Sequence, residues 1–423
     1  SGTSCSLNNN AHVKEIQVEI GGTITVANGV SLEVENQVHI DGSLDLLGEA
    51  QLIQKHSTVS PNSGSGYISV KQQGVSNLHN YNYWSSPVNN GGSWQIGDLE
   101  DANGVINFNN ALNANANTTP ITLSSRWLYS FNGLSNTYSQ WNPLSSSSNL
   151  LPGIGYTMKG SGTANTEQEY IFKGIPNDGN YSYPVTANND FLIGNPYPSA
   201  LNADQFINDN STVIDGTLYF WEHFTSNSSH SLIDYEGGYA VYNLMMSLPA
   251  VVDPSGLTSG NGSASKTAPT SSIPVGQGFF VTITNSGNLV FNNQQRVFAR
   301  ESLSETIFYK SSNKKTSASL DHRAKIWFSF KEPKNRNRLF GLGYDVTTSK
   351  GYDNGYDAKA YDDQRNDIYW TLNDEKLIIQ ALPQIDINDN LPLKIKVTDP
   401  GIYKFSIDKM KYVPNTMDIF LKD

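Results

Sequence analysis

Cysteine is almost absent from this sequence of 423 residues: Cys5 is the only one, which excludes an internal disulfide. Charge is also sparse, because only 16% of the residues are charged and the formal net charge is −11. The lysines and arginines do not gather into a stripe that could follow a phosphate backbone, so nucleic acid is not expected as a partner. The densest basic segment, residues 331–338 (KEPKNRNR), is interpreted as the tip of a hairpin.

Long hydrophobic runs are missing too. No apolar stretch approaches the roughly 18 residues of a membrane span, and no signal peptide is present. Because the first residue is Ser1 and not methionine, we expect a mature or excised piece of a precursor whose export signals lie outside this sequence. The seven histidines form no HExxH motif and no zinc-ligand spacing, which argues against a zinc enzyme.

Aromatic and small polar residues are what the chain has in quantity. Hydrophobic residues make up 37% and aromatics 11%, while Asn, Ser, Gly and Thr supply most of the polarity. This composition is typical of a β-rich extracellular protein. The length suits two or three domains. We predict an all-β chain with a solenoid-like segment over residues 1–75, a β-rich central module with long loops over 76–310 and an antiparallel β-sandwich over 311–423.

The N-terminal prediction depends on short alternating apolar patterns. Between residues 16 and 54 apolar side chains recur with period two, and Gly-Gly, Asn-Gly or Asp-Gly pairs separate the runs. Such brief strands are either rungs of a small parallel solenoid or hairpins of a meander, since Asn-Gly is also a favoured hairpin turn. The solenoid is the favoured interpretation. From Lys325 onward seven strand-like runs recur between prolines, a spacing that suits a sandwich.

The most unusual segment is GNPYPSAL at residues 194–201. Its two prolines hold the backbone extended, and Asn202 with Gln205 three residues later predicts a short capped helix directly after it. Tyr197 between the prolines is interpreted as a buried plug. Ser199 has no base in its local sequence, so a structural role is favoured over a nucleophilic one.

These residues also carry a resemblance. NYWSSPV (82–88), PGIGYTMKGSG (152–162), LIGNPYPSAL (192–201), IPVGQGFFV (273–281) and FNNQQRVF (291–298) occur in order, and the run resembles a module recurrent in exported proteins of the Bacteroidota. Downstream, GYDVTTSKGYDNGYDA (343–358) and IYWTLNDEKLIIQALP (368–383) resemble the β-sandwich that commonly precedes the C-terminal sorting signal of such proteins. The resemblance spans nearly the whole chain.

The resemblance implies export by the type 9 secretion system and a place at the cell surface, associated with the outer membrane. It implies a non-catalytic adhesin, display or attachment region, with the secretion and anchoring machinery, neighbouring surface proteins and polysaccharide as partners. The alternative is an accessory, glycan-binding region of a secreted carbohydrate-active enzyme. No catalytic residue is assigned under either interpretation.

Three aromatic residues are candidates for stacking on sugars, because they lie in Asn- and Ser-rich, loop-like surroundings: Trp94, Tyr138 and Trp141. Core packing is the expected role of the tryptophans in strand patterns. A hydrolase would need two carboxylates in one cleft, and the only acids of the central module among many aromatics are Glu222, Asp234 and Glu236. Glu222 in FWEHF is the one most expected to be buried.

An acidic cluster in a Gly- and Tyr-rich loop is the candidate metal site, since hard oxygen ligands suit calcium. The proposed ligands are Asp353, Asp357, Asp362 and Asp363, with Asp367 close behind. Their spacing is not that of an EF-hand. The alternative, which is favoured, is that Asx turns of these aspartates shape a long loop without an ion.

Overall fold

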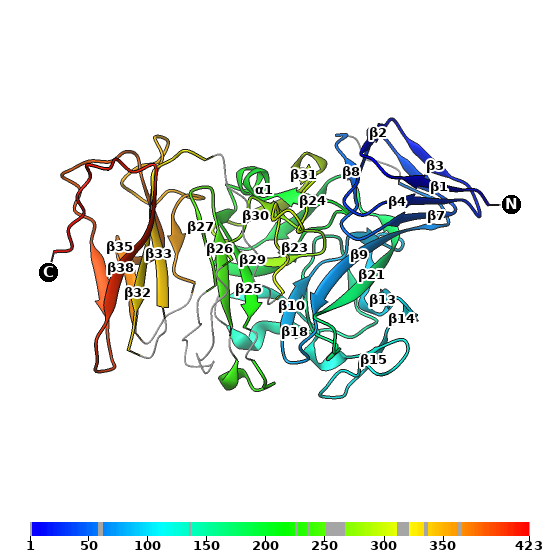
Figure 1. Ribbon diagram of the computed structural model, residues 1–423, viewed down its shortest axis with the longest axis horizontal. Coiled ribbons are helices and arrows are strands. Elements are labelled where there is room, and N and C mark those ends of the chain that lie inside the picture. The colour runs from blue at the N-terminus through cyan, green and yellow to red at the C-terminus, as the bar shows by residue number, and fades with distance from the viewer. Residues whose placement is uncertain are drawn as a thin grey trace.

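The computed structural model of this protein describes residues 2–57, 62–134, 137–224, 227–235, 237–250, 267–310, 321–333, 337–361 and 366–422. The described structure is nearly all β, with 47% strand and 5% helix, so the predicted all-β class is confirmed. A solenoid-like segment lies at one end, the central module follows, and a further group of strands lies at the other end (Figure 1). No helix in the ranges given above is long and apolar enough to cross a membrane.

The N-terminal segment is a short solenoid with three faces. The first face stacks β1 (Ser4–Leu7), β4 (Thr23–Val26), β7 (Ser43–Leu46) and β9 (Tyr67–Val75); the second stacks β2 (Ala11–Val13), β5 (Ser31–Val34) and β8 (Gln51–Gln54); the third stacks β3 (Ile16–Val18) and β6 (Val38–Ile40). All these pairings are parallel. Hairpin strands run antiparallel, so the solenoid prediction is confirmed and the meander alternative is excluded.

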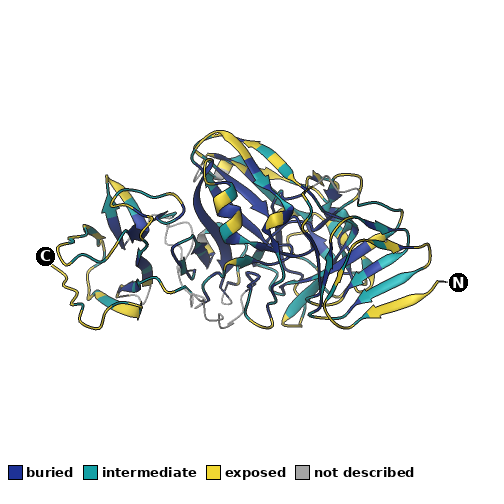
Figure 2. Cartoon of the chain, turned by 90° about the horizontal axis from the view of Figure 1, so that it is seen from above, coloured by how far each residue is buried: buried dark blue, intermediate teal, exposed yellow. Residues whose placement is uncertain are grey.

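Register explains why the alternating pattern forms a core. Rows of equivalent residues stack from rung to rung, as in the row Leu7, Val26, Leu46 and Val70. Val26 and Leu46 are fully buried, whereas the outermost rung is mostly exposed (Figure 2). The corners are tight: a Cβ at Gly42 would lie 2.1 Å from the carbonyl oxygen of Gly22. Glycine therefore punctuates the rungs where neighbouring turns touch.

The solenoid continues directly into the central module. On one side β9 pairs in parallel with β7, and on the other it pairs antiparallel with β21 (Glu167–Pro176) along eight residue pairs. The same sheet extends to β13 (Glu100–Asp101) and β14 (Gly104–Val105), with β11 (Val88–Asn89) also on β21. One hydrophobic cluster runs from Val18 to Phe308 across this joint. The solenoid and the module therefore share a core.

The second large sheet forms the centre of the molecule. Its strand order is β10 (Tyr81–Trp84), β20 (Tyr156–Lys159), β17 (Tyr129–Leu134), β23 (Asn189–Gly194), β29 (Gly278–Ile283), β25 (Ile214–His223), β26 (Gly237–Tyr242) and β27 (Ser247–Leu248), with β18 (Trp141–Pro143) on β17. Side chains alternate between two cores, so that Phe279 and Val281 enter one cluster while Phe280 enters the other. The short helix α1 (Ala203–Asp209) packs its buried residues into the first of these.

Smaller pairings complete the module. They are β12 (Trp94–Gln95) with β19 (Asn149–Leu150), β15 (Asn107–Asn109) with β16 (Thr122–Ser124), β22 (Tyr181–Val185) with β30 (Gly287–Phe291), and β24 (Ala200–Asn202) between β28 (Ser272–Ile273) and β31 (Arg296–Val297).

The C-terminal strands described by the structure form one hydrogen-bonded sheet of seven, six of them in a single path. The path is β37 (Leu393–Lys396), β35 (Asp367–Leu372), β36 (Glu375–Leu382), β33 (Asn337–Tyr344), β32 (Lys325–Lys331) and β38 (Lys404–Lys411), with β34 (Ala358–Lys359) on β36. All pairings are antiparallel except that of β33 with β36, which is parallel. The predicted antiparallel pairing therefore holds with one exception, and the division of these strands into the two packed sheets of a sandwich stays a prediction.

The C-terminal strands pack closely on the central module. Their cluster includes Phe280 and Met246 of the central module together with Phe340 of β33. Gly341 makes room for this contact, since a Cβ there would lie 2.1 Å from the sulfur of Met246. Hydrogen bonds also cross the joint, including Gly355 N to Asp215 O at 2.9 Å. The domain boundaries at residues 75 and 310 remain predictions, and both lie between residues that share a core.

Candidate functional site

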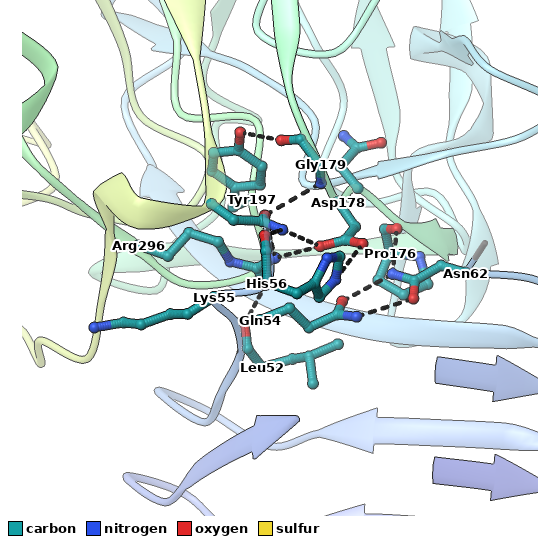
Figure 3. A network of polar contacts seen from close by, with 12 residues as sticks. Leu52, Gln54, Lys55, His56, Asn62, Pro176, Asp178, Gly179, Tyr197 and Arg296 are labelled. Atoms are coloured by element: carbon teal, nitrogen blue, oxygen red, sulfur yellow. Dashed lines mark hydrogen bonds and ion pairs between the residues drawn. The ribbon is translucent and has the colours of Figure 1, made fainter. Parts of the chain in front are cut away.

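Tyr197 of the segment GNPYPSAL takes part in a buried polar network (Figure 3). Tyr197 is fully buried, and its hydroxyl donates to the carbonyl oxygen of Gly179 at 2.7 Å. The side-chain amide of Asn195 donates to Ser199 O at 2.7 Å and to the carbonyls of Ile273 and Pro274. These bonds satisfy the backbone of an extended segment that has no ladder partner at its prolines. The predicted tyrosine plug is confirmed.

An aspartate, a histidine and an arginine from three parts of the chain meet beside Tyr197 (Figure 3). The Asp178 carboxylate lies 2.9 Å from His56 Nε2 and 3.2 Å from Arg296 Nη1. Arg296 is fully buried, donates to Leu52 O at 2.7 Å and lies 4.9 Å from the centre of the Tyr197 ring. Burial lowers the pKa of the Arg296 guanidinium, while Asp178 opposes that shift. The network thus joins the solenoid, which supplies Leu52 and His56, to the central module.

The geometry of this network gives Ser199 no base. Its hydroxyl accepts from Arg296 Nε at 3.3 Å and donates to Ala200 O at 3.2 Å. A serine nucleophile needs a hydrogen bond to a general base, and an arginine is charged and only donates. With Ser199 and Arg296 fully buried, the arrangement is suited to holding segments together.

The helix after GNPYPSAL begins as the sequence predicts. The side chain of Asn202 accepts from Gln205 N at 3.0 Å and caps α1. At the far end of α1, Asp209 accepts hydrogen bonds from Asn292 and Gln295. The segment that contains Arg296 is thereby fixed to the same helix.

The three aromatic candidates for sugar stacking lie in different surroundings. Trp94 is 1% exposed and packs against Phe172 and Tyr156, so the expected exposed ring at Trp94 is wrong. The surrounding sequence is loop-like because β12 is only two residues long, but this short strand lies over the core and Trp94 is buried there. Tyr138 lies in a short turn of helix, Tyr138–Gln140, and its side chain is outside the described part.

Trp141 is the candidate that keeps a partly exposed ring. It lies on β18 at the margin of the central sheet and contacts the rings of Phe131, Phe280 and Tyr83 at 5.1–6.3 Å between centroids. Sugar binding by Trp141 stays a prediction. The structure does not unite Trp94 and Trp141 in one surface, because each belongs to a different core.

A cluster that the sequence did not reveal surrounds Lys159 at the end of β20. Its amine lies 3.9 Å from the centre of the Trp127 ring and is also near the rings of Tyr81 and Tyr235. The amine bonds to Tyr235 Oη at 2.9 Å and to His230 Nδ1 at 3.0 Å. Burial lowers the pKa of Lys159 to about 7. Strand alternation alone could not have found this site, since its partners come from loops far apart in sequence.

His230 is held on both sides in this cluster. Its ring stacks on Trp127 at 4.8 Å and lies 4.5 Å from the ring of His79. Burial, Lys159 and His79 together lower the pKa of His230 to about 4. Near neutral pH the imidazole is therefore uncharged, and its Nδ1 accepts a hydrogen bond from the Lys159 amine. These contacts hold the loop that contains His230 against the sheet.

The central-module acids differ in their burial. Glu222 is 5% exposed on β25, in agreement with its predicted burial. Asp234 is exposed and accepts from Ser229 Oγ at 3.0 Å. Glu236 lies outside the described part.

In the acidic loop, the side chains of Asp353 and Asp357 accept hydrogen bonds from backbone N–H groups. Asp353 accepts from Ser349 N at 2.6 Å, and the two oxygens of Asp357 accept from Asp353 N and Ala381 N, each at 2.7 Å. Burial nevertheless raises the pKa of Asp357 to about 7. Asp367 forms an ion pair with Arg338, with 2.8 Å between Oδ1 and Nε. These bonds favour the loop-shaping alternative for these residues.

The rest of the calcium prediction stays open to experiment. Asp362 and Asp363 lie outside the described part of the chain. Among the residues that the structure does describe, no group of three or more His, Cys, Asp or Glu side chains could hold a metal ion.

Comparison with known proteins places the chain in a family without giving it an activity. No curated protein and no solved structure matches the chain. A family model described as "Domain of unknown function (DUF8693)" matches residues 2–423. This chain therefore belongs to the DUF8693 family.

Proposed function

We propose that this chain is a non-catalytic region of a secreted or cell-surface protein, exported by the type 9 secretion system, that acts as an adhesin, display and attachment module. The observation that supports the proposal is the structural role of the recurrent motifs. GNPYPSAL and FNNQQRVF supply Tyr197 and Arg296 to one buried network that joins the solenoid to the module. Motifs used in this way maintain a scaffold and leave recognition to exposed surfaces outside them.

The experiment for this proposal is protease treatment of intact cells of the encoding bacterium. We expect the chain to be digested on intact wild-type cells and protected inside cells that lack the type 9 translocon. Protection in both strains would contradict surface display. An abundant periplasmic protein serves as the control for cell integrity.

The second candidate function is a glycan-binding accessory region of a carbohydrate-active enzyme. It is favoured by the partly exposed Trp141 beside the aromatic residues of the central sheet. Affinity electrophoresis in gels that contain neutral polysaccharides tests it. Retardation that Trp141→Ala abolishes would support the accessory role, and Leu134→Ala, at an exposed position of the neighbouring strand, is the matched control.

A chain that is itself an enzyme would release sugars from plant or algal polysaccharides. Under our proposal, no reducing sugar appears above that of a heat-denatured sample. Turnover that Glu222→Gln removes while the melting temperature stays constant would overturn the non-catalytic assignment.

A further inference from the structure

Five lysines share one face of the C-terminal strand pair β32 and β38. On β32 the residues Lys325, Trp327, Ser329 and Lys331 alternate onto that face. Their partners across the pair are Lys411, Lys409, Ser406 and Lys404, in that order. Lys331 and Lys404 are therefore directly opposite each other, as are Lys325 and Lys411. Like charges in directly opposite positions destabilise a sheet, so a face built in this way is notable in a chain of net charge −11.

A bulge in β38 creates the arrangement. Phe328 pairs with Ile407 whereas Trp327 pairs with Lys409, so Asp408 is an extra residue in the strand. Without it, strict alternation from Lys404 would place Lys409 and Lys411 on the opposite face, toward the core. A bulge of this kind re-aims side chains. Here it places Lys404, Lys409 and Lys411 on one side and turns Met410 to the other.

Four of the five lysines of this face lack partner charges among the described residues. Lys331, Lys404 and Lys409 are exposed, Lys411 is partly buried, and none of the four forms an ion pair with a carboxylate of the described residues. Lys325 differs, because Asp321 holds its amine at 2.6 Å. The acid within the face is Asp408, which accepts from Ser329 Oγ at 2.7 Å. We call Lys331, Lys404, Lys409 and Lys411 the lysine face.

Trp327 adds a flat ring to the lysine face. Its side chain is partly exposed, and the amine of Lys409 lies 5.3 Å from the ring centre. The strand β38 lies at the end of the molecule opposite the solenoid (Figure 1). A long ligand could therefore lie along the strand pair without contact with the solenoid.

We propose that the lysine face binds an anionic polysaccharide, one that carries carboxylate or sulfate groups along its chain. The face offers a row of cations at strand spacing, and a polyanion replaces the missing partner charges. A sugar polymer fits better than nucleic acid, because the face contains no arginine and presents a single aromatic ring instead of a series for base stacking. This inference names a ligand class for the proposed attachment role, on which it rests.

The test uses the whole chain and immobilised polysaccharides in biolayer interferometry. Dextran sulfate and polygalacturonate separate sulfate from carboxylate recognition, and neutral dextran is the uncharged control. We expect binding to one or both polyanions, none to neutral dextran, and about a tenfold or greater loss between about 50 and 200 mM salt. Equal binding to neutral dextran would overturn the proposal.

The decisive variant is Lys404→Gln with Lys411→Gln. We expect about a tenfold loss of polyanion affinity at low salt, because two of the four cations are removed. The melting temperature should stay constant or rise, since each replaced lysine faces another lysine. The matched control is Lys14→Gln with Lys55→Gln, which removes the same charge from two exposed residues of the solenoid segment and should leave affinity within about twofold.

Two outcomes would assign the lysines differently. Lysines on an edge strand also prevent edge-to-edge aggregation, so unchanged affinity with new self-association of the Lys404/Lys411 variant would overturn the proposal in favour of edge protection. Tighter binding of single-stranded DNA than of either polysaccharide would overturn it in favour of a nucleic-acid surface. Neither result bears on surface display, which the protease experiment tests independently.

Discussion

At the scale of single residues, the stability of the chain depends on buried polar groups that lie far apart in sequence. The sequence allowed the Tyr197 plug and the Asn202 cap to be predicted, because prolines and caps act on their neighbours. It could not reveal that Arg296 reaches both Asp178 and Leu52. Nor could it show that Lys159 lies among three rings, or that Trp94 is covered. Such contacts are made by the tertiary fold.

The Arg296 network yields the first prediction. Arg296→Met leaves the buried Asp178 carboxylate without its arginine, and we expect a loss of about 3–5 kcal/mol in the free energy of unfolding. Urea denaturation measures the change. The exposed Arg126→Ala is the control and should cost less than about 1 kcal/mol. A loss as small as that of the control would show that the network does not hold the fold.

Lys159 gives a prediction for pH. Its pKa is about 7 in the folded chain against an ordinary value of 10.5, so between these values the unfolded chain binds the additional proton. The cost in folding free energy of burying the Lys159 amine is therefore fully present below pH 7, and it decreases as the pH rises above 7. We expect the free energy of unfolding of Lys159→Met to rise less than that of the wild type between about pH 7 and 9.5. If the free energy of unfolding changed with pH equally in both proteins, the prediction of a buried, uncharged Lys159 amine would be wrong.

At the scale of elements, the sequence pattern predicted the type of secondary structure better than it predicted which strands pair with each other. Period-two runs with Gly punctuation predicted the short strands and favoured the solenoid, although the same runs also fit hairpins of a meander. They did not predict that β9 pairs with β21 on its free side or that β33 and β36 are parallel. Pairing between distant strands depends on the whole chain, and a bulge such as that at Asp408 shifts the face of every later residue.

Within the solenoid, Leu44→Ala tests the stacked core. Leu44 is fully buried between Ile24 and Ile68 of the neighbouring rungs. We expect a loss of about 2–5 kcal/mol, since a buried leucine truncated to alanine leaves a cavity. Thermal and urea unfolding measure it, with the partly exposed Leu47→Ala as the control. Equal effects of the two substitutions would contradict a packed solenoid interior.

Removal of metal ions tests the role of the acidic loop. Because Asp353 and Asp357 already bond to the backbone, we expect EDTA to leave the melting temperature unchanged. A clear decrease that added calcium reverses would establish a structural calcium site, with Asp362 and Asp363 as further ligands.

At the scale of the whole molecule, the parts form one connected body. The solenoid shares a sheet and a core with the central module, and the C-terminal strands share a core with the module's other face. A continuous body of this kind can carry load from one end to the other. This architecture suits attachment, with the lysine face at the end opposite the solenoid.

The most direct test of the attachment role is the adherence of a strain in which the codons for this chain are deleted in frame. The account predicts that the mutant adheres poorly to a polysaccharide-coated surface, that the restored gene recovers adherence, and that growth in rich medium is normal. Adherence equal to that of the wild type would contradict it.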